Sequence, residues 1–93
     1  MFKTNEYFDG QVKSIAFTTP DGPATVGVMA PGEYEFGTST NEHMTVTSGK
    51  LFIMFPESDT WQLFKTCETF IVEKDAKFKV KVVADASYFC LYQ

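Results

Sequence analysis

Residues 31–49 read PGEYEFGTSTNEHMTVTSG, and this stretch decides the fold. Turn-forming residues stand at both of its ends, and polar and apolar residues alternate between them. Because successive side chains of a strand point to opposite faces, Glu42 shares a face with Met44 and Val46. Burying an unpaired carboxylate costs several kcal/mol or raises its pKa. We therefore predict that Glu42 is either hydrogen-bonded or functional.

The same alternation continues in both directions from this stretch, and the 3.6-residue period of helices is nearly absent. The sequence therefore predicts an all-β chain with turns at short, regular intervals, which favours a sandwich or a small barrel. The run from Pro20 to Pro23 predicts a hairpin. Residues Asn5–Phe8 stay open, and one interpretation adds them to a partner subunit as an extra strand. The expected strands are Gln11–Thr18, Thr25–Met29, Glu33–Phe36, His43–Thr47, Lys50–Phe55, Trp61–Phe64, Thr69–Glu73, Phe78–Val83 and Ser87–Tyr92.

Composition limits the class of protein. A length of 93 residues, of which 44% are hydrophobic, predicts one folded domain over residues 1–93. All 8 basic residues are Lys and the net charge is -4, which disfavours binding to nucleic acid. The N-terminus lacks the apolar core of a secretory signal and no run is long enough for a membrane helix. We therefore expect a cytoplasmic protein without membrane contact, in which Cys67 and Cys90 stay reduced.

Glu42 is the candidate catalytic residue, and we expect it to project into an apolar interior. The residues predicted to line that interior, and so to contact a substrate, are Tyr34, Phe36, Met44, Phe78 and Tyr88. For each aromatic residue, core packing is the simpler interpretation.

Two further charged or titratable residues follow from the alternation. Lys13 shares a face with Ile15 and Phe17, and one interpretation is that it points inward, where it could neutralise a carboxylate or bind phosphate; snorkelling to solvent is the simpler interpretation. His43, the only histidine, is one position out of phase with Glu42 and is therefore predicted to lie on the opposite face.

The spacing from Glu42 to Gly49 is similar to half of a cupin motif, which usually holds a metal through histidines. Counting back from Glu42 places Phe36 and Thr38, or the residue before each, at the histidine positions, and Phe78 at the third. One carboxylate cannot hold a transition metal by itself. We predict no metal and no cofactor.

Several runs together cover essentially the whole chain: Asn5–Phe8, Val12–Ile15, Ala24–Thr38, Glu42, Met44–Val46, Ser48–Gly49, Trp61–Gln62 and Tyr88–Tyr92. They resemble the cupin-type pyrimidine/purine nucleoside phosphorylases. The resemblance implies a cupin-like jelly-roll barrel and a cytoplasmic homodimer. It also implies cleavage of many nucleosides, with inorganic phosphate as co-substrate, to free base and ribose 1-phosphate. Leu91 stands where members of the family can carry Arg, so phosphate needs another donor, for which Lys13 and main-chain amides are the candidates.

The enzyme hypothesis is physically reasonable because a carboxylate offsets the positive charge that builds on the sugar as an N-glycosidic bond breaks. Aromatic walls would stack any base, at about 1–3 kcal/mol per base. Two alternatives stay open: a non-catalytic nucleoside- or sugar-binding cupin, and a structural dimer in which internal hydrogen bonds satisfy Glu42. Candidate dimer contacts are the N-terminal segment and the outward His43, Thr45 and Thr47.

Overall fold

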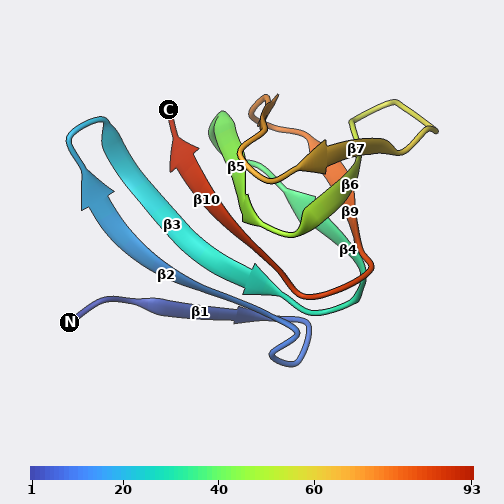
Figure 1. Ribbon diagram of the computed structural model, residues 1–93. Coiled ribbons are helices and arrows are strands. Elements are labelled where there is room, and N and C mark those ends of the chain that lie inside the picture. The colour runs from blue at the N-terminus through green and yellow to red at the C-terminus, as the bar shows by residue number, and fades with distance from the viewer.

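The computed structural model describes residues 1–93 and consists of strands, turns and loops (Figure 1). No helix has the length and hydrophobicity needed to cross a membrane. The strands are β1 (Thr4–Tyr7), β2 (Val12–Thr19), β3 (Gly22–Met29), β4 (Gly32–Gly37), β5 (Glu42–Ser48), β6 (Lys50–Met54), β7 (Gln62–Lys65), β8 (Thr69–Val72), β9 (Lys77–Val82) and β10 (Ala86–Tyr92).

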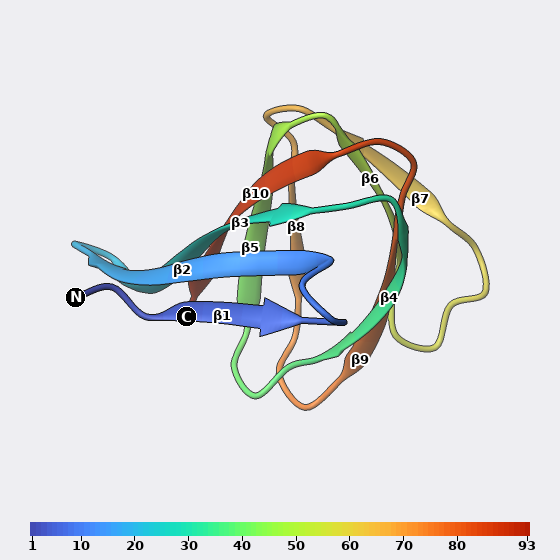
Figure 2. The ribbon, with the colours of Figure 1, turned by 90° about the horizontal axis from the view of Figure 1, so that it is seen from below.

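The strands form two antiparallel sheets that face each other. The large sheet has six strands in the order β1-β2-β3-β10-β5-β8, and the small sheet has four in the order β4-β9-β6-β7. From β3 onward, every connection except the β6–β7 hairpin crosses from one sheet to the other. Figure 2 shows β4 and β9 on one side of the molecule, with β10, β5 and β8 on the other. The predicted all-β architecture is confirmed.

Every strand expected from the alternation is present, with boundaries shifted by a few residues. The predicted hairpin joins β2 to β3, where Thr19 pairs with Gly22. The Thr19 hydroxyl donates to the carbonyl of Gly22 (2.8 Å) and accepts from the amide of Asp21 (3.1 Å). The segment Asn5–Phe8, for which the sequence left the structure undecided, lies largely in β1, and β1 pairs with β2 of the same chain. In this structure it is therefore not an added strand of a partner.

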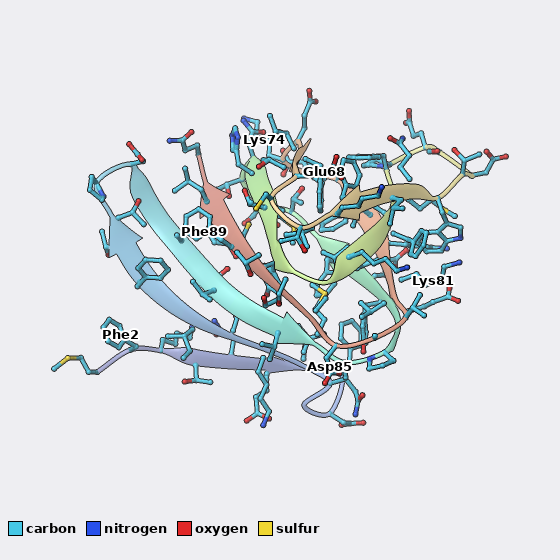
Figure 3. All side chains as sticks on the ribbon, viewed as in Figure 1. Phe2, Glu68, Lys74, Lys81, Asp85 and Phe89 are labelled. Atoms are coloured by element: carbon cyan, nitrogen blue, oxygen red, sulfur yellow. The ribbon has the colours of Figure 1, made fainter.

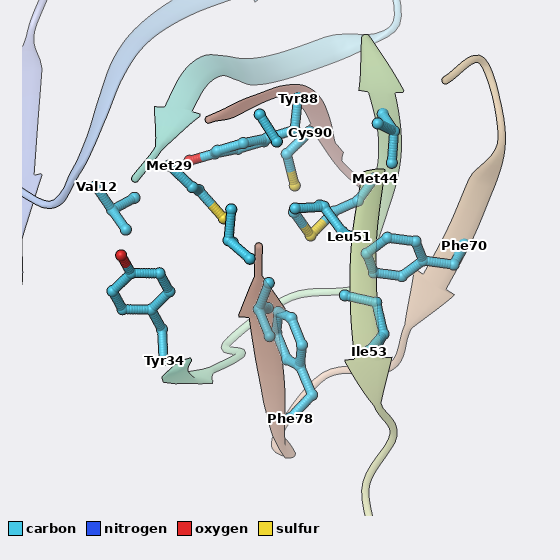
Figure 4. Packing of buried hydrophobic residues seen from close by; sticks show 14 of the residues in the cluster. Val12, Met29, Tyr34, Met44, Leu51, Ile53, Phe70, Phe78, Tyr88 and Cys90 are labelled. Atoms are coloured by element: carbon cyan, nitrogen blue, oxygen red, sulfur yellow. The ribbon is translucent and has the colours of Figure 1, made fainter. Parts of the chain in front are cut away.

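A single cluster of buried side chains fills the space between the sheets, and Figure 4 shows its packing. The small sheet contributes residues with no exposed surface, among them Leu51, Ile53 and Val80. The large sheet contributes Met44 and Val46, the two residues that the alternation places on the same face as Glu42. The core thus occupies most of the interior. It thereby determines which side chains lie next to the Glu42 carboxylate.

The alternation of β2 has the predicted period but the opposite orientation. Val12 and Ser14 point to the core, with exposed fractions of 0% and 3%. Lys13 therefore does not point inward: its side chain is 55% exposed and its Nζ lies 3.9 Å from Glu6 Oε1, so the interpretation that places it in the interior is wrong. The outer face of β2 carries the larger apolar residues, Ile15 and Phe17, whereas the small inward Ser14 leaves room for other side chains. Hydrophobicity alone therefore indicated the wrong face.

Truncating Leu51 should test the core. Leu51 is fully buried, so Leu51→Ala removes apolar contacts and leaves a cavity, which should lower the free energy of unfolding by about 2–5 kcal/mol. Urea denaturation followed by circular dichroism measures this difference. The matched control is Val83→Ala, because Val83 is 60% exposed and its truncation should change the free energy by no more than about 0.5 kcal/mol. Equal effects of the two substitutions would contradict this description of the core.

Candidate active site

A pocket of about 270 Å³ lies between the two sheets and is open to solvent. Most of its polar groups, including the phenols of Tyr88 and Tyr92, come from the large sheet. Its Phe rings come from the small sheet and from the turn between β1 and β2. A site built in this way can hold a ligand that is polar at one side and flat and apolar at the other. The lining residues are Tyr7, Phe8, Ser14, Met29, Glu35, Phe36, Gly37, Glu42, Met44, Phe78, Tyr88, Cys90 and Tyr92.

Glu42 is the first residue of β5, and its carboxylate lies in this pocket. β10 runs beside β5, so Glu42 pairs with Tyr92 and lies diagonally across from Cys90. The Cys90 thiol donates a weak hydrogen bond to Glu42 Oε1 over 3.7 Å. Burial raises the pKa of the Glu42 carboxyl, and the thiol opposes this shift. The carboxylate is thus partly desolvated and weakly compensated, as in sites that use a carboxylate for chemistry.

Tyr88 lies flat against the backbone of β3, an arrangement that requires a glycine at position 27. A Cβ atom on Gly27 would come within 2.6 Å of the Tyr88 ring, too close for any side chain. Gly27 pairs with both Ser14 and Tyr88, so these three residues form one row across the sheet. Burial raises the pKa of Tyr88 to about 12, and the Ser14 side chain opposes the shift. The phenol therefore stays protonated and able to donate at neutral pH.

Two further groups of β10 also stay protonated. The Tyr92 hydroxyl forms a hydrogen bond of 3.0 Å with the hydroxyl of the buried Thr25. Burial is the main cause that raises the pKa of Tyr92. Burial, with the nearby Glu42 charge, raises the pKa of the Cys90 thiol to about 12. The lining contains no Lys and no His, so the pocket offers neutral donors and carboxylates rather than cations.

Most of the sequence-predicted site residues come together here. Phe36, Met44, Phe78 and Tyr88 line the pocket with Glu42. Tyr34 does not line it. Its hydroxyl donates to the carbonyl of Ala30 over 2.6 Å, and its ring packs behind Phe8 at a centroid distance of 5.0 Å. Tyr34 therefore supports the wall without forming its surface.

Three other positions lie outside the pocket. Lys13 borders a separate depression on the other side of β2, together with Ser48 and Ser87. His43 pairs with Leu91 and Ile71, on the outward face of the large sheet, as the alternation predicted. Leu91 shares that face, so any residue at this position points away from Glu42. No group of three or more His, Cys, Asp or Glu side chains that could hold a metal is present.

Sequence reasoning missed several lining residues. Cys90 and Tyr92 follow Tyr88 at steps of two along β10, so the alternation that placed Tyr88 could have found both. Ser14 was hidden by the orientation error on β2. Tyr7 and Phe8 had no such signal, because their position depends on the turn that follows β1.

Comparison with known proteins places these features in a family context. The chain matches the family model described as pyrimidine/purine nucleoside phosphorylase over residues 2–92. A protein of that name from Alcanivorax borkumensis is 62% identical over 92 residues, which cover 99% of this chain and 98% of the relative. Another from Pseudomonas putida is 58% identical over 93 residues, covering 100% of this chain and 99% of the relative.

Solved structures agree on the architecture. A protein of unknown function from Vibrio parahaemolyticus superimposes with a TM-score of 0.96 at 39% identity, covering 100% of this chain and 99% of that one. A putative ethanolamine utilization protein from Salmonella typhimurium reaches a TM-score of 0.77 at 12% identity, covering 99% and 93% of the two chains. Likeness at so low an identity concerns the fold alone, and it confirms the predicted cupin-like fold.

The burial of Glu42 predicts a pH-dependent effect on stability. Its pKa is higher in the folded chain than in the unfolded chain, so the folded state loses stability as pH rises through the folded pKa. Glu42→Gln removes this loss, so the variant should melt at a higher temperature than the wild type at pH 7–8. The difference should shrink toward zero below about pH 4, where the carboxyl is protonated in both states.

Thermal unfolding between pH 3.5 and pH 8 measures this difference. Glu33→Gln is the matched control, because Glu33 is an exposed residue of β4 outside the pocket, and its difference should stay small throughout. A variant at position 42 that is less stable than the wild type at pH 8 would disprove the desolvation of this carboxylate.

Proposed function

Because this chain belongs to the pyrimidine/purine nucleoside phosphorylase family, we propose that it cleaves purine and pyrimidine nucleosides with inorganic phosphate, in the pocket around Glu42. The products are the free base and ribose 1-phosphate. The observation that carries the assignment of the site is the desolvated Glu42 carboxylate in a pocket that is also lined by aromatic rings.

Glu42 supplies the electrostatic part of catalysis in this proposal. A phosphate oxygen forms a bond to the anomeric carbon of the sugar while the bond to the base nitrogen breaks. The bonding electrons leave with the base, which takes up a proton. Positive charge develops on the sugar during this exchange, and a carboxylate in a poorly solvated site stabilises that charge more strongly than in water. The ionised form of Glu42 therefore performs the chemistry.

Hydroxyl groups hold the phosphate in this proposal. Lys13 lies outside the pocket and is not part of the site. Ser14, Tyr88 and Tyr92 line the pocket from the large sheet, and burial keeps both phenols protonated and able to donate. Neutral donors bind an anion less strongly than cations do, so we expect a high KM for phosphate and little dependence of that KM on ionic strength.

The first test is an assay for base release. Inosine, guanosine and uridine should each yield free base only when phosphate is present, as measured by chromatography. Glu42→Gln keeps the size of the side chain but removes the charge, so kcat/KM should fall about 10²- to 10³-fold. Glu33→Gln should retain wild-type activity. Base release without phosphate would refute phosphorolysis, and unchanged turnover in Glu42→Gln would refute the role of Glu42.

We further propose that residues 1–93 form one domain and that two such chains form a homodimer in the cytoplasm. The two free thiols are consistent with a reducing compartment. The outer face of the large sheet carries exposed β-branched residues, among them Ile15, Val26 and Val28, with exposed fractions of 48%, 46% and 56%. A neighbouring shallow depression is lined by Phe2, Phe17 and two of these residues. A second copy seated on this face by two-fold symmetry would bury all of them.

Light scattering after gel filtration tests the dimer. The wild type should have twice the mass of one 10.5 kDa chain, including at micromolar concentration. Val26→Glu places a charge in the centre of the face, between Ile15 and Phe89, and should raise the dissociation constant at least about 100-fold. Gln62→Glu on β7 of the small sheet is the control and should remain dimeric. A wild type that is monomeric at 100 µM would end this proposal.

A further inference from the structure

The end of β1 and the turn that follows it take no part in the chemistry above, yet two adjacent side chains there line the pocket. Tyr7 is the last residue of β1 and Phe8 is the first residue of the turn. Each is 44% exposed, so neither ring is needed to complete the buried core. An aromatic ring that is half exposed at a pocket wall is available to contact a ligand.

The backbone of this turn is held in an uncommon conformation. Phe8 and Asp9 have φ angles of 53° and 56°, in the left-handed region that residues other than glycine seldom occupy. The amide of Gly10 donates to the carbonyl of Tyr7 (3.2 Å), and the amide of Gln11 donates to that of Phe8 (3.1 Å). Such backbone strain is concentrated at functional sites, where it fixes a side chain that regular geometry would direct elsewhere.

The strained turn brings Phe8 against the aromatic wall of the opposite sheet. Its ring contacts Phe36 edge-on at a centroid distance of 5.6 Å, and Phe36 in turn lies 5.8 Å from Phe78. Tyr7 also meets Phe36 edge-on, at 6.2 Å. The large sheet supplies most of the polar groups of the pocket, including Glu42, whereas Phe8, Phe36 and Phe78 form an apolar part of its lining.

We propose that the Phe8 ring is the stacking surface on which the nucleobase binds, and that Phe36, which is edge-on to Phe8, closes the apolar wall beside the base. The inference rests on the proposed function, in which the sugar lies beside Glu42, and it assigns the base to the aromatic part of the pocket. Stacking uses the π face that every base has, so it binds purines and pyrimidines without reading their edges. A site of this kind accounts for a broad choice of nucleosides.

The reverse reaction separates the base from the sugar, because they enter as two substrates. With hypoxanthine and ribose 1-phosphate, Phe8→Ala should raise the KM for the base about tenfold. The KM for ribose 1-phosphate should change less than about twofold, since the sugar phosphate does not contact the ring. The rise should be smaller for uracil, which has less surface to stack. Phe8→Tyr should restore the KM for both bases.

Leu63→Ala is the matched control. Leu63 is 40% exposed, does not line the pocket, and lies on β7, on the side of the molecule away from Phe2 and the proposed dimer face (Figure 3). Its removal should leave both KM values unchanged. Melting temperatures establish that each variant is folded.

Two results would overturn the assignment of Phe8. One is an unchanged KM for the base in folded Phe8→Ala, and the other is an equal rise in both KM values, which indicates a structural role. If the wild type releases no base with phosphate, the proposed function fails independently. Equilibrium binding of inosine to the wild type and to Phe8→Ala then tests whether the base stacks on Phe8. Equal dissociation constants for the two proteins would refute this stacking.

Discussion

The desolvation of one carboxylate is the constraint on which the site depends. Glu42 stands at the start of β5 with only the Cys90 thiol as a side-chain hydrogen-bond donor. Stronger hydrogen-bond donors could satisfy the carboxylate fully. The carboxylate charge would then be offset by those donors and would stabilise a positive charge developing on the sugar less strongly. The two sheets therefore hold the Glu42 carboxylate in an environment that is unfavourable for its charge. The apolar packing in the rest of the interior supplies the stability that offsets this cost.

The proposed reaction poses a second electrostatic problem. Phosphate, an anion, must approach a carboxylate, and the lining has no Lys or His to attract it. Burial keeps the phenols of Tyr88 and Tyr92 protonated, so they offer hydrogen bonds without adding charge. A positive side chain beside Glu42 would attract phosphate more strongly, but it would also pair with the carboxylate and reduce its effect on the sugar. Neutral donors avoid this conflict.

The sequence was sufficient for nine of the ten strands and for the position of Glu42, because these depend only on local alternation and turn residues. It was insufficient where the answer depended on contacts between distant segments. Which face of β2 points inward depends on the side chains that pack against Ser14. The rule that apolar residues lie inside fails here because the outer face of β2 is also apolar. The close approach of Tyr88 to Gly27 joins two strands that are far apart in the chain. The turn at Phe8 depends on φ angles that no residue there demands.

The order of strands in the large sheet has a consequence for how the protein is made. β10 lies between β3 and β5, although it follows every other strand in the chain. The β1-β2-β3 half therefore cannot join the β5-β8 half until translation has passed residue 92. Tyr88, Cys90 and Tyr92 all lie on this strand, so the pocket around Glu42 cannot form before β10 has been synthesised. Up to that moment the unpaired edges of β3 and β5 are exposed, which makes the nascent chain a natural client for chaperones.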